Sequence, residues 1–165
     1  MGTAVLFLDL DDFKHVNDDM GHDAGDALLT AVGHRIVNAV RPGDLGCRIG
    51  GDEFAVLLPQ TPSLRDAEAV GRRLLEALTA PVEIEGRDLM VPASIGVALA
   101  PIGARVAVDE LLRQADVAMY QAKAAGKQRL ATYDPRRDPG PAAHAVQAPH
   151  ARKPRMEPAE ASPAA

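Results

Sequence analysis

The apolar and polar positions in the first half of the chain predict a buried strand and two helices. Residues Thr3–Leu8 form a short apolar run, which is typical of a strand buried on both faces. Between Ala24 and Val40 the apolar residues recur at helical spacing, so this segment predicts an amphipathic helix. Ser63 followed by Asp66 is a typical helix start and predicts a second helix over Ala67–Thr79.

A hairpin is predicted in the second half of the chain. Val82–Glu85 and Asp88–Ala100 flank the turn residue Gly86, and Pro92 implies an edge position or a bulge in the second of these strands. The predicted order is strand, helix, two strands, helix, two strands, helix and strand. We expect an α+β domain, with a mostly antiparallel central sheet flanked by helices.

The domain is expected to end near residue 133. Asp109 is expected to cap the last helix and Gly126 to end it, before a short strand that finishes near Tyr133. Seven of the 13 prolines lie in the last 31 residues, and these residues show no apolar periodicity. Such a segment buries too little surface to offset its ordering entropy. Residues 1–133 are therefore predicted to be one domain, and residues 134–165 a disordered tail.

Composition favours a cytoplasmic protein that does not bind nucleic acid. The single cysteine, Cys47, excludes an internal disulfide and fits a reducing compartment, and we expect it to be a buried thiol in a strand. No apolar stretch approaches the roughly 20 residues that span a bilayer. A net charge of −5, with three Phe, two Tyr and no Trp, argues against a nucleic-acid surface.

The segment Arg48–Phe54 predicts a tight hairpin that carries carboxylates at its tip. Gly50 and Gly51 precede Asp52 and Glu53, between two apolar runs. Glycine allows a large polar ligand to approach the backbone, and adjacent acids are suited to holding a divalent cation against phosphates. The alternative is a solvated acidic hairpin tip without a ligand.

A second acidic segment directly follows the first predicted strand. Asp9 stands at the carboxyl end of that strand, where a side chain can meet a metal or a phosphate. The backbone amides of Asp12, Phe13 and Lys14 are placed to form a concavity for phosphate oxygens. Asp9 and Asp52 would then meet around one cation. The alternative is an acidic turn before a helix.

Taken together, these segments resemble the GGDEF family, the diguanylate cyclases. Five motifs match in order within residues 4–133: Asp9–Asp18, Gly21–Asp26, the hairpin segment Arg48–Phe54, Ala93–Ala98 and Ala115–Lys127. The resemblance implies the nucleotide-cyclase, palm-like fold of that family. It also implies condensation of two GTP molecules to cyclic di-GMP with release of two pyrophosphates, across a homodimer in which each chain holds one GTP.

The resemblance assigns roles to the two acidic segments. Asp9, the Leu10 carbonyl and Asp52 are expected to hold Mg²⁺ (or Mn²⁺), which would neutralise phosphate charge. Either Asp52 or Glu53 would assist deprotonation of the attacking hydroxyl, and the sequence does not decide between them.

The same resemblance indicates how GTP is recognised. Asn17 and Asp26 match the base-reading positions, and their amide and carboxylate complement guanine better than adenine. The alternative for both is helix capping. His22 either lines the nucleotide site or lies in a polar loop. Lys123 and Lys127 are expected on one helix face, close to the triphosphate, although a solvated face is the usual interpretation of such a pair.

Arg41 and Asp44 match the family's inhibitory Arg-x-x-Asp motif, where bound cyclic di-GMP would restrain the chains in a non-productive arrangement. The alternative is a Pro-Gly turn with an incidental ion pair. Arg72 or Arg73 of a neighbouring chain is a further candidate for this site.

One departure from the family concerns the start of the domain. Family members begin a few dozen residues earlier, with an Asp-x-Leu-Thr-x-Leu loop and a helix that packs on the sheet. This chain starts at the first strand, so we expect an N-terminally truncated domain with an uncovered apolar sheet face. Two other functions remain open, a non-catalytic module that binds GTP or cyclic di-GMP and a cyclase that acts on a single purine nucleotide.

Overall fold

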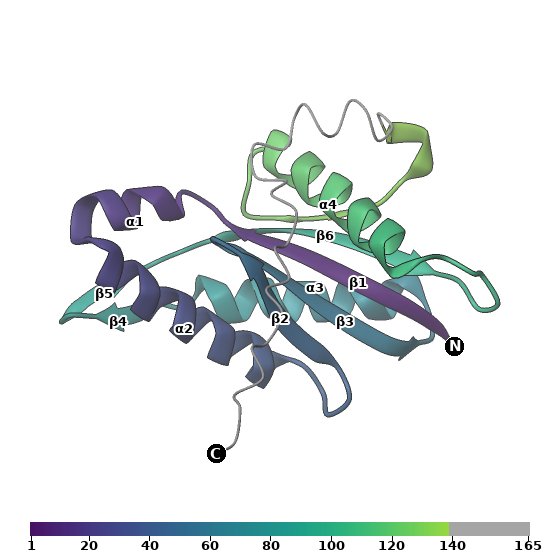
Figure 1. Cartoon of the computed structure of the whole chain (residues 1–165), viewed down its shortest axis with the longest axis horizontal. Helices are drawn as coiled ribbons and strands as arrows, with labels where there is room; N and C mark the ends of the chain where they lie inside the picture. The colour runs from purple at the N-terminus through teal and green to yellow at the C-terminus, as the bar shows by residue number, and fades with distance from the viewer. Residues whose placement is uncertain (139–165) are drawn as a thin grey trace, which may run out of the picture.

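The fold is built on a five-stranded sheet with the order β2-β3-β1-β6-β7 (Figure 1). The computed structural model describes residues 1–138. The strands are β1 (Gly2–Leu10), β2 (Leu45–Gly50), β3 (Glu53–Thr61), β6 (Ala93–Ala100) and β7 (Leu130–Thr132). β1 pairs antiparallel with both β3 and β6, β2 pairs antiparallel with β3, and β7 alone runs parallel to its neighbour. The prediction of an α+β fold with a mostly antiparallel sheet is confirmed.

Helices cover both faces of this sheet. They are α1 (Phe13–Met20), α2 (His22–Ala39), α3 (Leu64–Thr79) and α4 (Val108–Ala124). In Figure 1, α4 lies on one face over β1 and β6, and α2 and α3 lie on the other. As predicted, Ser63 caps α3, because its side chain accepts a hydrogen bond from the backbone N–H of Asp66. No helix in residues 1–138 is both long enough and apolar enough to cross a membrane.

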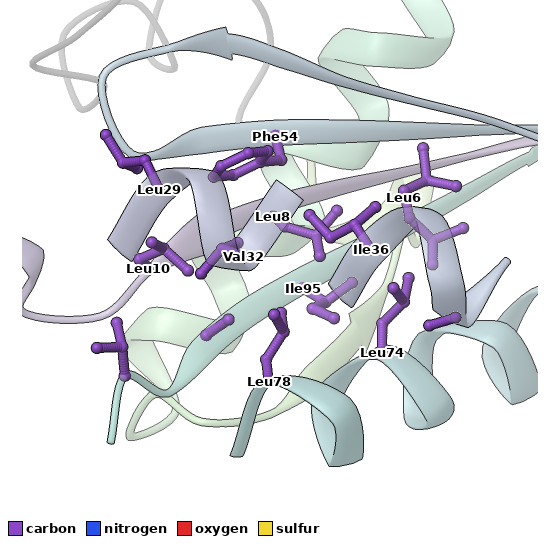
Figure 2. Close-up of a cluster of buried hydrophobic side chains, with 14 of the residues drawn as sticks. Leu6, Leu8, Leu10, Leu29, Val32, Ile36, Phe54, Leu74, Leu78 and Ile95 are labelled. Carbon is purple, nitrogen blue, oxygen red and sulfur yellow. The ribbon is translucent and has the colours of Figure 1, made fainter. Parts of the chain in front are cut away.

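β1 is buried on both faces, which explains its continuous apolar sequence. Leu6, Leu8 and Leu10 pack in the larger core cluster with α2 and α3 (Figure 2). Val5 and Phe7, which alternate with them, pack in the smaller cluster under α4. The carboxyl end of β1 is therefore held from both sides, and the acidic residues that follow it start from a rigid position.

The close approach of α4 to the sheet depends on Gly96 in β6. A Cβ atom at this position would overlap the backbone oxygen of Ala115 and the backbone nitrogen of Met119. Both belong to α4, whose backbone does not move without moving the whole helix. The glycine therefore sets how deeply α4 packs, and α4 carries Lys123 in its last turn.

Three predicted elements differ in detail. α1 is a separate helix, because Gly21 adopts φ 85° and breaks the helical path before α2. The strand predicted over Asp88–Ala100 is two strands: β5 (Arg87–Leu89) pairs with β4 (Val82–Ile84) in a small second sheet, and β6 begins only after Pro92. The prediction that Asp109 caps α4 is wrong, since the helix begins at Val108 with Ala107 at the cap.

The expectation of a buried Cys47 is also wrong. This thiol is exposed because β2 is an edge strand and α4 covers β1 and β6 instead. Leu45 and Ile49 of the same strand are 61% and 49% exposed. An apolar strip of the sheet is therefore open to solvent along β2.

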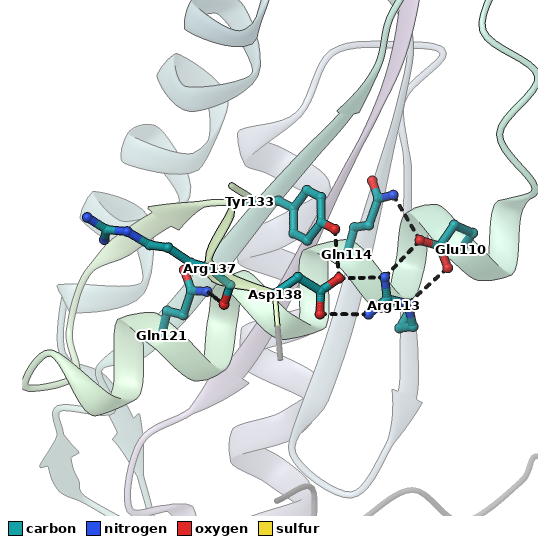
Figure 3. Close-up of polar contacts among 7 residues, drawn as sticks. All are labelled: Glu110, Arg113, Gln114, Gln121, Tyr133, Arg137 and Asp138. Atoms are coloured by element: carbon teal, nitrogen blue, oxygen red, sulfur yellow. Dashed lines mark hydrogen bonds and ion pairs between the residues drawn. The ribbon is translucent and has the colours of Figure 1, made fainter. Parts of the chain in front are cut away.

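Hydrogen bonds and ion pairs hold the segment after β7 against α4 (Figure 3). The guanidinium of Arg113 donates to the carboxylates of both Glu110 and Asp138, and the hydroxyl of Tyr133 donates to Asp138 at 2.7 Å. Hydrogen bonds from Arg113 and then from Gln114 lower the pKa of Glu110 to about 2. Residues 134–138 of the predicted tail thus lie along α4, whereas residues 139–165 are outside the described residues.

Candidate active site

The acidic residues of β1 and of the β2–β3 hairpin meet at one edge of the sheet. Asp9 stands opposite Glu53 in the β1–β3 register, and the backbone N–H of Leu10 donates to the Asp52 carbonyl at 3.2 Å. Gly50 ends β2 and pairs with Glu53, so Gly51 and Asp52 form the two-residue turn, and no neighbouring atom lies within 4 Å of a Cβ built on either glycine. The two segments that carry the predicted metal ligands are therefore adjacent, with open space at the hairpin tip.

Asp9 is the buried member of this acidic group. It is 4% exposed, and the ammonium of Lys123 lies 2.5 Å from its Oδ1 atom. Burial raises the pKa of Asp9 to about 6; the hydrogen bond and charge of Lys123 oppose this shift, and the carboxylates of Asp52 and Asp11 add to it. The contact with Lys123 shows that a positive charge can be placed beside this carboxyl group.

The predicted metal ligands form a partial set of oxygen donors. In residues 1–138 no three His, Cys, Asp or Glu side chains gather as a metal cluster. Mg²⁺ is usually held by one or two carboxylates together with substrate phosphates and water. Asp9, Asp52 and the Leu10 carbonyl supply such a partial set. The ammonium of Lys123 already contacts Asp9, so a positive charge can lie beside this carboxylate.

The turn after β1 leads directly into helix α1. Asp12 adopts a left-handed conformation, with φ 62°, immediately before α1 begins at Phe13. The amides of Phe13 and Lys14 therefore belong to the first turn of a helix, where N–H groups lack intrahelical acceptors. Lys127 lies 2.7 Å from Asp12 Oδ1, and this pairing lowers the pKa of Asp12 and raises that of Lys127.

Lys123 and Lys127 do not share a helix face, contrary to the prediction. α4 ends at Ala124, and Gly126 then adopts φ 114°, which terminates the helix as expected. Lys127 and Gln128 follow in left-handed conformations, with φ 60° and 50°. Both lysines nevertheless face the acidic segment, because Lys123 contacts Asp9 and Lys127 contacts Asp12.

The predicted base-reading residues lie on neighbouring helices. Asn17 of α1 packs against the backbone of Gly25 in α2, where an added Cβ would overlap its Oδ1 atom. Asp26, the next residue of α2, is exposed and borders a cavity of about 400 Å³ between α2 and the hairpin, which Arg48 and Phe54 also line. Asn17 does not line this cavity. His22, the first residue of α2, is exposed.

Asp11 is a buried carboxylate that our prediction of site residues omitted. It is 3% exposed and accepts hydrogen bonds from the Ser94 hydroxyl, at 2.9 and 3.0 Å, and from the Gln128 backbone N–H at 3.0 Å. Its own N–H donates to the Pro92 carbonyl. It therefore joins the end of β1 to the start of β6 and to the loop that carries Lys127. The signal in the sequence was the acid that lies between the two predicted site residues Asp9 and Asp12.

We expect Asp11→Ala to lower the free energy of unfolding by about 2 kcal/mol, because it leaves the buried Ser94 hydroxyl and the partly buried Gln128 N–H without their acceptor. Asp11→Asn is expected to cost less, since its amide can still accept from Gln128 and donate to the Ser94 oxygen. Urea unfolding measures both, with Asp18→Ala on the exposed side of α1 as the control. Equal stability of Asp11→Ala and Asp18→Ala would contradict this role.

The Arg41–Asp44 motif forms the turn predicted for it. The Asp44 N–H donates to the Arg41 carbonyl, and Arg41 Nε lies 3.1 Å from Asp44 Oδ1. Arg41 also donates to the Pro59 carbonyl at 2.8 Å. A cavity of about 250 Å³ beside the motif is lined by Arg41, Asp44 and Arg73 of the same chain. Arg72 is instead paired with Glu68.

Comparison with known proteins identifies the family. The family model described as "Diguanylate cyclase, GGDEF domain" matches residues 2–129. The chain therefore belongs to the GGDEF domain family. It is 44% identical over 137 residues to the diguanylate cyclase TpbB of Pseudomonas aeruginosa, which covers 81% of this chain and 31% of TpbB. It is also 43% identical over 126 residues to the cyclic di-GMP phosphodiesterase NbdA of the same organism, covering 76% of this chain and 16% of NbdA.

Solved structures agree with this assignment. The GGDEF domain of TpbB superimposes with a TM-score of 0.76 at 39% identity, over 81% of this chain and 83% of that one. The GGDEF domain of DgcB from Caulobacter crescentus, in complex with c-di-GMP, gives a TM-score of 0.70 at 26% identity, over 80% of this chain and 78% of that one. The chain spans less than a third of TpbB and less than a fifth of NbdA.

Proposed function

We propose that this chain is a diguanylate cyclase domain that condenses two GTP molecules to cyclic di-GMP and releases two pyrophosphates. The observation that carries the proposal is the meeting of Asp9 with the Asp52 hairpin tip, beside Lys123 and Lys127. Two carboxylates and two ammonium groups at one sheet edge suit a metal-bound triphosphate. Each chain holds one GTP, so the reaction requires two copies whose hairpins face each other.

Asp9, Asp52 and the Leu10 carbonyl are the proposed ligands of Mg²⁺ (or Mn²⁺). When bound, the ion supplies neutralisation of phosphate charge and a lower pKa for the attacking 3′-hydroxyl. The chain itself positions the triphosphate: the amides of Asp12, Phe13 and Lys14 point toward its oxygens, and the lysines contact it once they leave their acidic partners.

The proton of the attacking hydroxyl passes to a carboxylate of the hairpin tip. Glu53 stands opposite Asp9 on the same face of the sheet, and Asp52 lies directly at the turn. Both are half-buried, so either carboxylate is accessible to a hydroxyl brought by the second copy. The base is the residue, Asp52 or Glu53, whose replacement stops turnover while some metal binding remains.

Guanine is proposed to bind between α1 and α2, read by Asn17 and Asp26. The Asp26 carboxylate accepts from the N1 and N2 donors of guanine, whereas the N1 acceptor of adenine would repel it. His22 lies at the start of α2, close in sequence to this site. The exposed position of Asp26 leaves its carboxylate accessible to a base.

The proposal is tested by separating the products of a reaction that contains the chain, GTP and Mg²⁺ by anion-exchange chromatography. Cyclic di-GMP from GTP, and no cyclic dinucleotide from ATP, is the expected result. Appearance of 3′,5′-cyclic GMP would instead indicate a cyclase that acts on a single nucleotide.

A non-catalytic module that binds GTP or cyclic di-GMP is the second candidate. The similarity to NbdA favours it, because that protein is named for the phosphodiesterase activity although it contains a segment 43% identical to this chain. Binding of intact GTP, measured by titration calorimetry, without formation of a dinucleotide would select this function.

Arg41 and Asp44 are proposed to bind the product as an inhibitor. We expect Arg41→Ala to raise the inhibition constant of cyclic di-GMP about tenfold, since a charge-assisted contact to phosphate is lost. The initial rate without product should not change, because the motif lies outside the proposed catalytic residues. Product-inhibition kinetics measure both, with the exposed Arg65→Ala as the control. An unchanged inhibition constant would remove the assignment.

A further inference from the structure

The carboxylate proposed to bind the metal already has a cationic partner within the chain. Lys123 Nζ lies 2.5 Å from Asp9 Oδ1, and the Asp9 side chain is 6% exposed against 30% for Lys123. A buried carboxylate is costly without a counter-charge, and an ammonium in direct contact supplies one. The contact thus keeps the charge of Asp9 balanced when no divalent cation is bound.

The same ammonium is needed elsewhere when substrate binds. Lys123 lies in the last turn of α4, has a flexible four-carbon stem, and is one of the two lysines proposed to contact the triphosphate. A divalent cation held by Asp9 would share this carboxylate with the ammonium, and two positive groups in contact with one carboxylate would repel each other strongly.

We propose that Lys123 is the resident counter-ion of the metal site, so that its ammonium competes with the divalent cation for Asp9 until a triphosphate draws the lysine away. The inference rests on the proposed function, because it takes Asp9 as a metal ligand and Lys123 as a phosphate ligand. Its consequence is a positive coupling: the nucleotide-free chain binds metal weakly, and metal and triphosphate strengthen each other's binding.

The neighbouring pair of Lys127 and Asp12 provides a matched comparison. Its atoms are 2.7 Å apart, but the two side chains are 44% and 55% exposed. Water therefore solvates Asp12 when the lysine is removed, and Asp12 is not among the proposed metal ligands. Loss of Lys127 changes the local charge by the same amount as loss of Lys123, without freeing Asp9.

The test is Mn²⁺ binding to the nucleotide-free chain at pH 8, followed by the electron paramagnetic resonance signal of free Mn²⁺. Lys123→Met is expected to bind Mn²⁺ about tenfold more tightly than the wild type, whereas Lys127→Met should change the affinity much less. Lys123→Gln is a second neutral variant, and Lys123→Arg, which keeps the charge, should retain weak binding. With GTP present, Lys123→Met should lose most of the coupling between metal and nucleotide.

Unchanged or weaker Mn²⁺ binding by both neutral Lys123 variants, each folded by circular dichroism, would overturn the inference. The measurement involves no turnover, so it separates the two proposals. Tighter Mn²⁺ binding by Lys123→Met, together with a wild-type chain that makes no cyclic di-GMP, would support the counter-ion and contradict the cyclase. If the wild-type chain forms cyclic di-GMP but the Lys123 variants bind Mn²⁺ with unchanged affinity, the cyclase is supported and the counter-ion role is contradicted.

Discussion

Asp52→Ala is expected to lower the rate of cyclic di-GMP formation by about a thousandfold or more, because several kcal/mol of metal-dependent charge stabilisation are lost with the carboxylate. The fold should be unaffected, since Asp52 lies at a hairpin tip and its backbone carbonyl still accepts from Leu10. Initial rates of product formation at saturating GTP measure the change.

A carboxylate outside the site provides the control for this variant. Asp88→Ala removes an exposed acid from the small β4–β5 hairpin and should leave the rate unchanged. Both variants should melt within a few degrees of the wild type. An Asp52→Ala chain that keeps its activity would contradict the assignment of Asp52 as a metal ligand, whether or not the rate of the control variant changes.

Gly96→Val should have the largest effect on stability. Its Cβ would overlap backbone atoms of Ala115 and Met119, so α4 must move away from β6 as a unit. Overpacking of a close-packed interior costs about 3 kcal/mol in such cases. Urea unfolding is expected to show this loss, and GTP binding should weaken with it because α4 carries Lys123.

Gly33 offers the matched control, because it lies in helix α2 with no atom within 4 Å of a built Cβ. Gly33→Ala should stabilise the chain by about 0.5–1 kcal/mol, the usual gain from replacing a helical glycine. Equal stability of the two variants would show that α4 does not depend on the close approach at Gly96.

Local sequence patterns predicted the parts of the fold that depend on burial. The apolar run of β1 and the glycine pair of the hairpin were sufficient, because strand burial and turn geometry are encoded within a few residues. The break between α1 and α2 was not predicted, since Gly21 follows a polar segment in which only Phe13 is buried. The exposure of Cys47 depends on which strand α4 covers, and strand order is not a local property.

The site residues also include some that the local sequence predicted and some that it did not. The acidic segments of Asp9 and Asp52 were identified from their place at strand ends, and the structure brings them together. The helical spacing of Lys123 and Lys127 was wrong, because Gly126 ends α4 before the second lysine. Asp11 was overlooked because its partners, Ser94 and Gln128, are 83 and 117 residues away in sequence.

The central claim, condensation of two GTP molecules, is tested most directly by counting products. One reaction of the wild-type chain with GTP and Mg²⁺ gives the pyrophosphate released and, by mass spectrometry, the cyclic di-GMP formed. We predict two pyrophosphates for each cyclic di-GMP, and neither product from Asp52→Ala. Pyrophosphate without the dinucleotide, or bound GTP that stays intact, would contradict the proposed reaction.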